Sequence, residues 1–474
     1  MSTTVTAADF PEIRWHGHWI WVAEDKIEMG SGTPGEPPPP RKASNGLFRK
    51  TFTLDSVPER VPTRITADSR YTLYVNGKEV SRGPIRSQPR RMMYDRFDLA
   101  PFLKVGENII AVVVRFYQHS NSFYIPAVPN MGLGKTGVLV FEANLGAAGW
   151  LVSDASWKAT KCTAWTNDGL EGGSFVTHGV PVELFDASQM PVGWQNAAFD
   201  DNTWQNVQLL RAVHIGGFAR SQPPTDPYGP LYPNPLAALT GDVVTPVHLK
   251  AEKIEGALDT SIVSPAMRMI KSIALPATPA AGDLFPHAVE FGSHGTRLLI
   301  DFGRIVAGLA QLEIDAPAGT VIDLCYVETP LTGKEQGFLA PSNGSRYIAR
   351  GHDDRFEAFD GNGLRMIYLF VHPTNGAVTI KRLAVRERLY PWTAGASFEC
   401  SDPELNRLYE AGIRTVRLNS HDAFLDCPTR EQRAWVGDSV VHQMVHLATN
   451  LDWQLAWRYL ELGNSPRYDG ILPM

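Results

Sequence analysis

The spacing of apolar residues changes once along the chain, near Ser397, and this change limits the folds open to it. Upstream, apolar residues alternate with polar ones or form short runs between glycine, proline and asparagine, as in β-strands. Downstream, they recur every three or four residues, as on one face of an α-helix. We therefore expect a mainly β, multidomain protein with a helical segment at residues 393–474, and 474 residues are enough for roughly two to four domains.

The first β-rich region extends over residues 47–240, after an N-terminal segment at residues 1–46. Residues 71–75 alternate between apolar and polar, and Asn76-Gly77 is a strong hairpin signal before a returning strand. Residues 109–116 and 137–142 are rich in β-branched residues and predict buried strands. Short strands separated by turn residues at this density predict a β-sandwich, similar to a jelly roll.

Two features of this part of the chain allow more than one interpretation. Trp157 and Trp204 could stack on sugar rings, but core or rim packing is the commoner role of a large aromatic side chain. Prolines 37–40 could bind a partner as a polyproline II segment, but a stiff surface loop is favoured. A second proline-rich stretch, residues 222–246, predicts an extended connection and a domain boundary near residue 240.

Residues 241–392 predict a second β-sandwich. Alternating or continuous apolar runs bounded by turn residues predict strands at residues 297–303, 310–315, 321–326 and 364–371.

Three helices are predicted after residue 392. Asp402 can cap the first helix, with Pro403 at its first position. Asp452 is the expected cap of the third helix. The apolar faces are formed by Leu405, Leu408, Tyr409, Ile413 and Val416 in the first helix, by Val440, Val441, Met444, Leu447 and Ala448 in the second, and by Trp453, Ala456, Trp457 and Leu460 in the third.

Composition excludes several classes of function. The chain is 43% hydrophobic and 20% charged with a net charge of -6, so we expect no nucleic-acid partner. Its 4 cysteines lack CxxC spacing, which argues against a disulfide framework or a zinc ribbon and favours a reducing compartment. We see no signal peptide and no apolar run of membrane-spanning length, and therefore expect a cytoplasmic protein with no membrane partner.

Acidic residues, arginines and a tryptophan crowd into residues 426–438, between the first two predicted helices. Pro428 keeps Cys427 out of helical geometry, so Asp426 is expected on an extended or turning backbone. Glu431 and Asp438 are seven residues apart, which would be two turns if the intervening backbone were helical. That spacing would allow both carboxylates to face one pocket.

These acids have a structural and a catalytic interpretation. With Arg430 and Arg433 beside them, they can simply form ion pairs at helix ends. A pocket that cleaves glycosides needs a protonated carboxyl, a second carboxylate, polar groups for ring hydroxyls and an aromatic wall. The turn at Pro428 and the nearby Trp435 favour the catalytic interpretation.

Other motifs carry less weight. His442 and His446 have a possible metal-ligand spacing, but Gln443 follows His442 where an HExxH site needs glutamate, so a structural role is favoured. Residues 420–422 read Ser-His-Asp, yet a hydrolase triad assembles across space rather than between chain neighbours. We expect no metal and no cofactor, because acid/base cleavage of glycosides needs neither.

Residues 426–438, with the sequence DCPTREQRAWVGD, closely resemble the signature of bacterial α-L-rhamnosidases of glycoside hydrolase family 78. Tyr74-Val-Asn-Gly-Lys78 with Arg82-Gly-Pro84 is similar to that family's N-terminal sandwich. Residues 301–308 and 317–320 resemble its second β-domain. The resemblance covers most of residues 47–474 and is most specific in the acidic motif.

The resemblance implies two β-sandwich domains followed by the first helices of an (α/α)6 catalytic barrel with an inverting mechanism. It implies Glu431 as the general acid, Asp426 and Arg430 as ligands of sugar hydroxyls, Trp435 in the pocket wall and Asp438 as a further essential acid. The family's general base is a glutamate far downstream, which is expected beyond residue 474. We therefore expect an N-terminal portion of a longer enzyme, inactive as these 474 residues alone.

The expected activity is removal of terminal α-L-rhamnose from oligosaccharides or glycosides, with the oligomeric state left open. A non-catalytic carbohydrate-binding module is one alternative. An α/α-barrel glycosidase of different sugar specificity is another.

Overall fold

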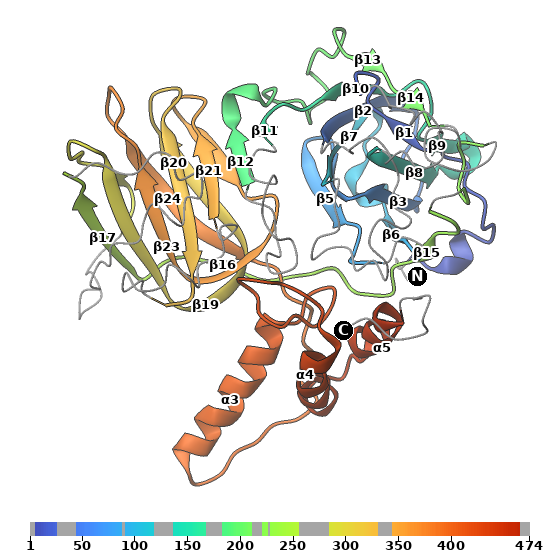
Figure 1. Cartoon of the computed structure of the whole chain (residues 1–474). Helices are drawn as coiled ribbons and strands as arrows, with labels where there is room; N and C mark the ends of the chain where they lie inside the picture. Colours follow the sequence, from blue (N-terminus) through green and yellow to red (C-terminus); the bar gives the residue numbers. More distant parts are fainter. Residues whose placement is uncertain are drawn as a thin grey trace, which may run out of the picture. The chain divides into compact units, whose positions relative to one another are not determined.

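The computed structural model describes residues 5–25, 44–87, 91–117, 136–166, 183–210, 220–225, 228–255, 284–329 and 344–464 (Figure 1). Prolines 37–40 lie outside these residues. The chain forms two compact units. Unit 1 comprises the described parts of Met1–Thr163 and Pro191–Pro235, and unit 2 those of Ala164–Met190 and Leu236–Asn464.

The described strands of unit 1 form two sheets. The first sheet has the order β14 (Gln208–Leu209), β1 (Ile20–Trp21), β8 (Val138–Asn144), β3 (Pro62–Asp68), β6 (Met93–Asp98) and β15 (Tyr232–Pro233), with β9 (Trp150–Val152) paired to β8. The second has the order β13 (Gln205–Asn206), β10 (Lys158–Lys161), β2 (Ser44–Leu54), β7 (Gly106–Phe116), β4 (Arg70–Val75) and β5 (Lys78–Gly83). Short 3-10 helices lie at Ala7–Asp9, Ala100–Phe102 and Gly146–Ala148.

Apolar side chains from both sheets form one core, as expected for a β-sandwich. Trp157 is fully buried in this core and Trp204 is 7% exposed, so the packing interpretation of both tryptophans is confirmed. The hairpin between β4 and β5 is also confirmed. Asn76 and Gly77 both have positive φ, 51° and 82°, as a two-residue turn of this kind requires.

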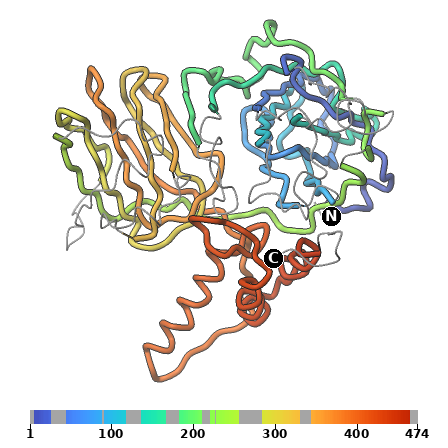
Figure 2. Tube along the Cα trace, viewed as in Figure 1, coloured from blue at the N-terminus to red at the C-terminus, as the bar shows by residue number. Residues whose placement is uncertain are grey.

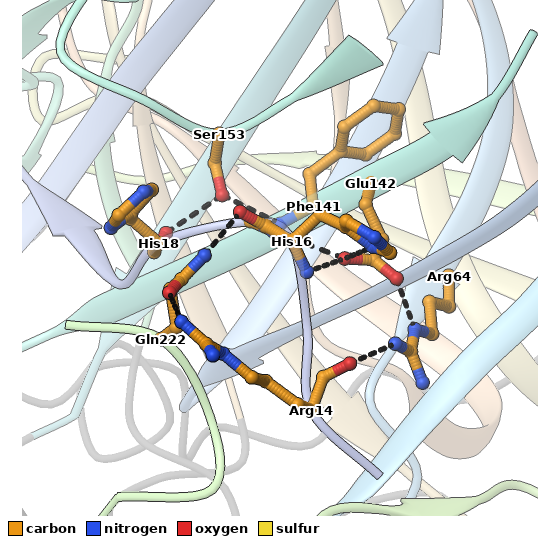
Figure 3. A network of polar contacts seen from close by, with 9 residues as sticks. Arg14, His16, His18, Arg64, Phe141, Glu142, Ser153 and Gln222 are labelled. Atoms are coloured by element: carbon orange, nitrogen blue, oxygen red, sulfur yellow. Dashed lines mark hydrogen bonds and ion pairs between the residues drawn. The ribbon is translucent and has the colours of Figure 1, made fainter. Parts of the chain in front are cut away.

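A buried ion pair fixes the N-terminal segment onto the first sheet (Figure 3). The carboxylate of Glu142 on β8 accepts hydrogen bonds from Arg64 Nε at 2.6 Å and from the backbone N–H groups of His16 at 2.6 Å and Gly17 at 3.0 Å. The Arg64 guanidinium also lies 4.2 Å from the centre of the Trp15 ring. Because Glu142 is fully buried, these partners replace the water that its charge loses on folding.

The described strands of unit 2 lie in one extensive sheet. Its order is β11 (Trp165–Thr166), β12 (Glu183–Asp186), β21 (Gly344–Ile348), β20 (Val321–Val327), β23 (Asn362–Val371), β19 (Thr296–Asp315), β24 (Thr379–Glu387) and β16 (Val243–Val244). Strands β17 (His248–Lys253) and β22 (Asp354–Glu357) also pair with β19, and β18 (His287–Ala288) pairs with β24. A 3-10 helix follows β12 at Ala187–Gln189.

Strand β19 replaces two strands that the sequence predicts separately at residues 297–303 and 310–315. Pairing with β23 shifts between Asp301 and Val306, and Gly303 adopts a positive φ of 73° there. The apolar residues that follow keep the strand in the sheet, so the glycine bends the strand without ending it. The two halves have different partners, with β17 beside residues 296–301 and β22 beside residues 311–314.

Strands β11 and β12 belong to unit 2, although they lie within residues 47–240, which the sequence predicts as the first sandwich. Parallel pairing of β12 with β21 brings them there. Trp165 Nε1 donates a hydrogen bond of 2.7 Å to the buried Glu183, whose other oxygen accepts one from the Phe359 N–H at 2.9 Å. Strands this short show no periodicity that would assign them to a sheet. The domain bounds expected from the sequence remain a prediction.

The three predicted helices are confirmed as α3 (Pro403–Leu418), α4 (Val436–Thr449) and α5 (Gln454–Gly463), at the C-terminal end of the trace in Figure 2. Asp402 caps α3 as expected, accepting a hydrogen bond from Glu404 N at 2.8 Å. Asp452 accepts from Gln454 N at 2.9 Å, but the N-cap residue of α5 is Trp453, one position later than predicted.

Many of the predicted apolar faces on these helices are exposed. Leu408 is 67% exposed, Met444 68% and Trp457 66%, and Leu405, Val440, Val441, Leu447, Trp453 and Leu460 are exposed as well. Apolar stripes of this kind normally pack against other helices.

Candidate active site

The acidic motif forms a loop between α3 and α4. Residues 428–431 form a turn, as Pro428 predicts, and the helical backbone begins only at Val436. The backbone from Glu431 to Trp435 is therefore not helical. The separation of seven residues does not place Glu431 and Asp438 on one helix face, contrary to the expectation for a helical segment. Asp438 instead lies in the first turn of α4 with its side chain exposed, where an acid favours the positive end of the helix dipole.

Asp426 and Arg433 close the loop, and we call residues 426–433 the acidic loop. Asp426 N donates to Arg433 O at 2.9 Å, and Arg433 N donates to Asp426 Oδ1 at 2.8 Å. Burial raises the pKa of Asp426, the Arg433 N–H group opposes this, and the charge of Glu431 adds to the rise. The net pKa lies above the ordinary value, so this carboxyl holds its proton more tightly than a free aspartate does.

Cys427 connects the two acids of the loop. Its thiol donates to Asp426 Oδ2 at 3.2 Å and accepts from Glu431 N at 3.3 Å. Burial raises the pKa of this thiol and keeps it protonated at neutral pH. The sequence predicted only that Cys427 precedes a turn, and nothing in its spacing indicates a bridging role.

The Glu431 side chain is held on both sides. One carboxylate oxygen pairs with the Arg430 guanidinium, and the other accepts a hydrogen bond of 2.8 Å from Trp435 Nε1. The Glu431 side chain is 13% exposed, whereas that of Arg430 is 53% exposed. From α5, Tyr459 donates to Trp435 O at 2.7 Å, which fixes the backbone that carries the tryptophan.

Residues in or next to the unit 2 sheet hold the acidic loop from outside the motif. Gly363 N donates to Pro428 O at 2.6 Å, and Gln432 Nε2 donates to Gly361 O at 3.0 Å. The Thr429 hydroxyl donates to Glu328 Oε1 at 2.5 Å. No motif in the sequence points to these partners. In the sequence, the closely spaced glycines at 361 and 363 are the one feature that is consistent with a close approach of two backbone segments.

The remaining candidates have structural contacts. His446 is fully buried, and its Nε2 lies 2.8 Å from Asp452 O. Burial lowers the pKa of both His442 and His446 and keeps them neutral. Ser420 donates to Val416 O at 2.7 Å.

Two absences hold for the described part of the chain. It contains no group of three or more His, Cys, Asp or Glu side chains arranged to hold a metal ion. None of its helices is both long and apolar enough to cross a membrane.

The loop thus combines the partly buried carboxyl of Asp426, whose pKa is raised, a second carboxyl held by an indole and a guanidinium, and an exposed arginine. A carboxyl in its protonated form can donate a proton to a leaving oxygen, and a second carboxylate can activate water. Arginine and aspartate are suitable partners for sugar hydroxyls. The loop therefore brings together side-chain types that acid/base cleavage of a glycoside requires.

Comparison with known proteins agrees with this chemistry. Residues 57–226 match the model of the α-L-rhamnosidase N-terminal domain, and residues 393–474 match that of the bacterial α-L-rhamnosidase 6 hairpin glycosidase domain. An α-L-rhamnosidase of Formosa agariphila is 22% identical over 419 residues, covering 83% of this chain and 36% of the relative. The chain therefore spans about a third of the length of this curated relative.

Solved structures show the same fold. The family 78 rhamnosidase of Bacillus sp. GL1 superposes with a TM-score of 0.73 at 20% identity, covering 94% of this chain and 63% of that one. The Streptomyces avermitilis α-L-rhamnosidase in complex with L-rhamnose superposes with a TM-score of 0.60 at 18% identity, covering 89% of this chain and 36% of that one. The two matched family models together cover more than half of the chain, which therefore belongs to the bacterial α-L-rhamnosidases of glycoside hydrolase family 78.

Proposed function

We propose that the protein removes terminal α-L-rhamnose from oligosaccharides or glycosides by single displacement with inversion, and that Glu431 is the general acid. The observation that carries the proposal is the position of Glu431 between Arg430 and Trp435, within a segment that matches a glycosidase domain. The relative from Streptomyces avermitilis, which was solved with L-rhamnose, supports the choice of sugar.

The other site residues have proposed roles that fit their surroundings. Asp426 and Arg430 would bind ring hydroxyls, and Trp435 would form a wall of the pocket. Asp438 would be a further essential acid, reaching the substrate from the first turn of α4. No cofactor is needed for this reaction.

The general base is proposed to lie on further helices of the catalytic domain. The exposed apolar faces of α3, α4 and α5 support this proposal, because helices packed against them would remove those side chains from water. Rhamnose release by the 474-residue chain alone, at the rate of the full-length gene product, would contradict it.

Replacing Glu431 tests the proposed acid. In the full-length gene product, the Glu431→Gln variant should hydrolyse a rhamnosyl disaccharide about 10²–10⁴-fold more slowly, because the leaving oxygen is no longer protonated. An aryl rhamnoside with a good leaving group should lose much less, because its departure needs little protonation. The exposed Glu410 on α3 provides a matched control, and Glu410→Gln should retain full activity on both substrates. Equal, mild losses on both substrates for Glu431→Gln would remove Glu431 from the acid role.

Product stereochemistry and a substrate panel test the rest of the proposal. Inversion predicts that β-L-rhamnose is the first product seen by NMR. Faster cleavage of another aryl glycoside than of the α-L-rhamnoside would favour a different sugar. The cytoplasmic location expected from the sequence also remains a proposal, to be tested by fractionating the source cells.

A further inference from the structure

The acidic loop is anchored through Pro428, Thr429 and Gln432 to one end of the unit 2 sheet. Its partners are Glu328, which directly follows β20, Gly361, which directly precedes β23, and Gly363 at the start of β23. Strands β20 and β23 are neighbours, with Val327 opposite Met366, so these partners lie close together in the sheet. The sheet thus provides a preformed support for a loop that has no regular structure of its own.

Two of the anchored residues flank Glu431 closely. Thr429 and Gln432 are 6% and 2% exposed, and Gln432 has a positive φ of 51°, which side chains other than glycine rarely adopt. Such a conformation persists only where the surroundings enforce it. Fixing the backbone on both sides of Glu431 limits where its carboxyl can point.

We propose that Glu328 is a positioning residue for the general acid, acting through Thr429. The Glu328 side chain accepts a hydrogen bond of 2.5 Å from the Thr429 hydroxyl. A hydrogen bond to a carboxylate is stronger than one between neutral groups. If this hydrogen bond is removed, the buried Thr429 hydroxyl loses its acceptor, and the turn that carries Glu431 can shift. A displacement of about 1 Å at a catalytic group costs on the order of 10²-fold in rate. The effect of Glu328 on catalysis rests on the proposed function of Glu431. Its effect on the conformation of the acidic loop does not depend on that function.

Kinetics of the full-length gene product test the catalytic consequence. Glu328→Ala and Thr429→Val should each lower kcat about 10–100-fold on a rhamnosyl disaccharide, with smaller changes in KM and on an activated aryl rhamnoside. The double variant should be no slower than either single variant, because both remove the same interaction. Glu328→Gln and Thr429→Ser keep the acceptor and the donor, and should recover most of the rate. Losses that multiply in the double variant would overturn the proposal.

Hydrogen exchange tests the restraint independently of activity. Amides of residues 426–433 should exchange faster in Glu328→Ala than in the wild-type protein. The matched control is Glu357→Ala, which removes a partly buried glutamate bound to Gln311 and Arg386 on the same sheet and should leave these amides unchanged. Equal exchange in both variants would overturn the positioning role. Faster exchange with no rhamnosidase activity in the wild-type protein would reject only the proposed function.

Discussion

Replacing Gly363 with alanine should push the acidic loop away from the unit 2 sheet. A Cβ atom at this position would lie 2.6 Å from Pro428 Cβ and 2.8 Å from its carbonyl carbon. Ordinary contact begins at 3.4 Å, so the proline or the strand must move by about 0.8 Å. Neither side can yield easily, because Gly363 is paired with Ala307 in β19 and the proline ring is rigid.

The magnitude follows from these contacts. Overpacking of this kind costs about 1–3 kcal/mol, and stretching the 2.6 Å hydrogen bond from Gly363 N to Pro428 O adds about 1 kcal/mol. We therefore expect unit 2 to lose about 2–4 kcal/mol of stability. If Glu431 moves with Pro428, activity on a disaccharide should fall on the order of 10²-fold.

The Gly361→Ala variant is a matched control two residues away. Its added Cβ would meet nothing closer than Gly308 O at 3.5 Å, an ordinary contact, and its own carbonyl would still accept from Gln432. Stability would be measured by hydrogen exchange of β19 and β23 peptides at increasing urea concentration, and activity by rhamnose release. If Gly363→Ala proved as stable and as active as Gly361→Ala, the loop would not be held against the sheet as the structure shows.

Two further predictions concern the carboxyls of Asp426, which is partly buried, and Asp323, which is fully buried. Burial raises the pKa of Asp426, so the folded protein binds this proton more tightly than the unfolded chain, and the stability contributed by the carboxyl falls as pH rises above about 4. Urea unfolding at pH 4 and pH 7 should therefore show Asp426→Asn gaining stability relative to wild type at the higher pH, and a constant difference would refute this. For Asp323, burial raises the pKa, but hydrogen bonds from Arg346 and His372 outweigh it and leave a net lowering. Asp323→Asn should cost about 3–5 kcal/mol at pH 7 and less as the pH falls below about 4, because the carboxyl then protonates in the unfolded chain and, at lower pH, in the folded protein; an equal cost at both pH values would contradict this assignment.

Local sequence signals were enough to predict secondary structure wherever a segment's conformation depends on interactions within a few residues. Asn76-Gly77 fixed a hairpin because few residues tolerate positive φ at two successive positions. Asp402-Pro403 fixed the start of α3 because the capping hydrogen bond and the restricted φ of proline act within one turn. The strand split predicted around Gly303 was wrong because a glycine can either end or bend a strand, and the pairing partners decide which.

The composition of the acidic motif marked the candidate site. The location of the site and the roles expected for Glu431, Asp426, Asp438, Arg430 and Trp435 remain predictions. The geometry came from the tertiary structure. The Glu431 carboxylate contacts Trp435 and Arg430 within a turn and not along a helix. The Cys427 thiol hydrogen-bonds to both the Glu431 N–H and the Asp426 carboxylate.

The sequence by itself determined the two kinds of secondary structure, their order and the position of the acidic motif, because periodicity, caps and turns act over a few residues. Only the tertiary structure decided that Glu328, Gly361 and Gly363 hold the motif in place. These residues are separated from it by roughly 65 to 100 positions, and no local pattern encodes a contact between them. The physical reason is that an irregular loop has too few internal hydrogen bonds to fix itself, so the packed sheet beside it sets its shape.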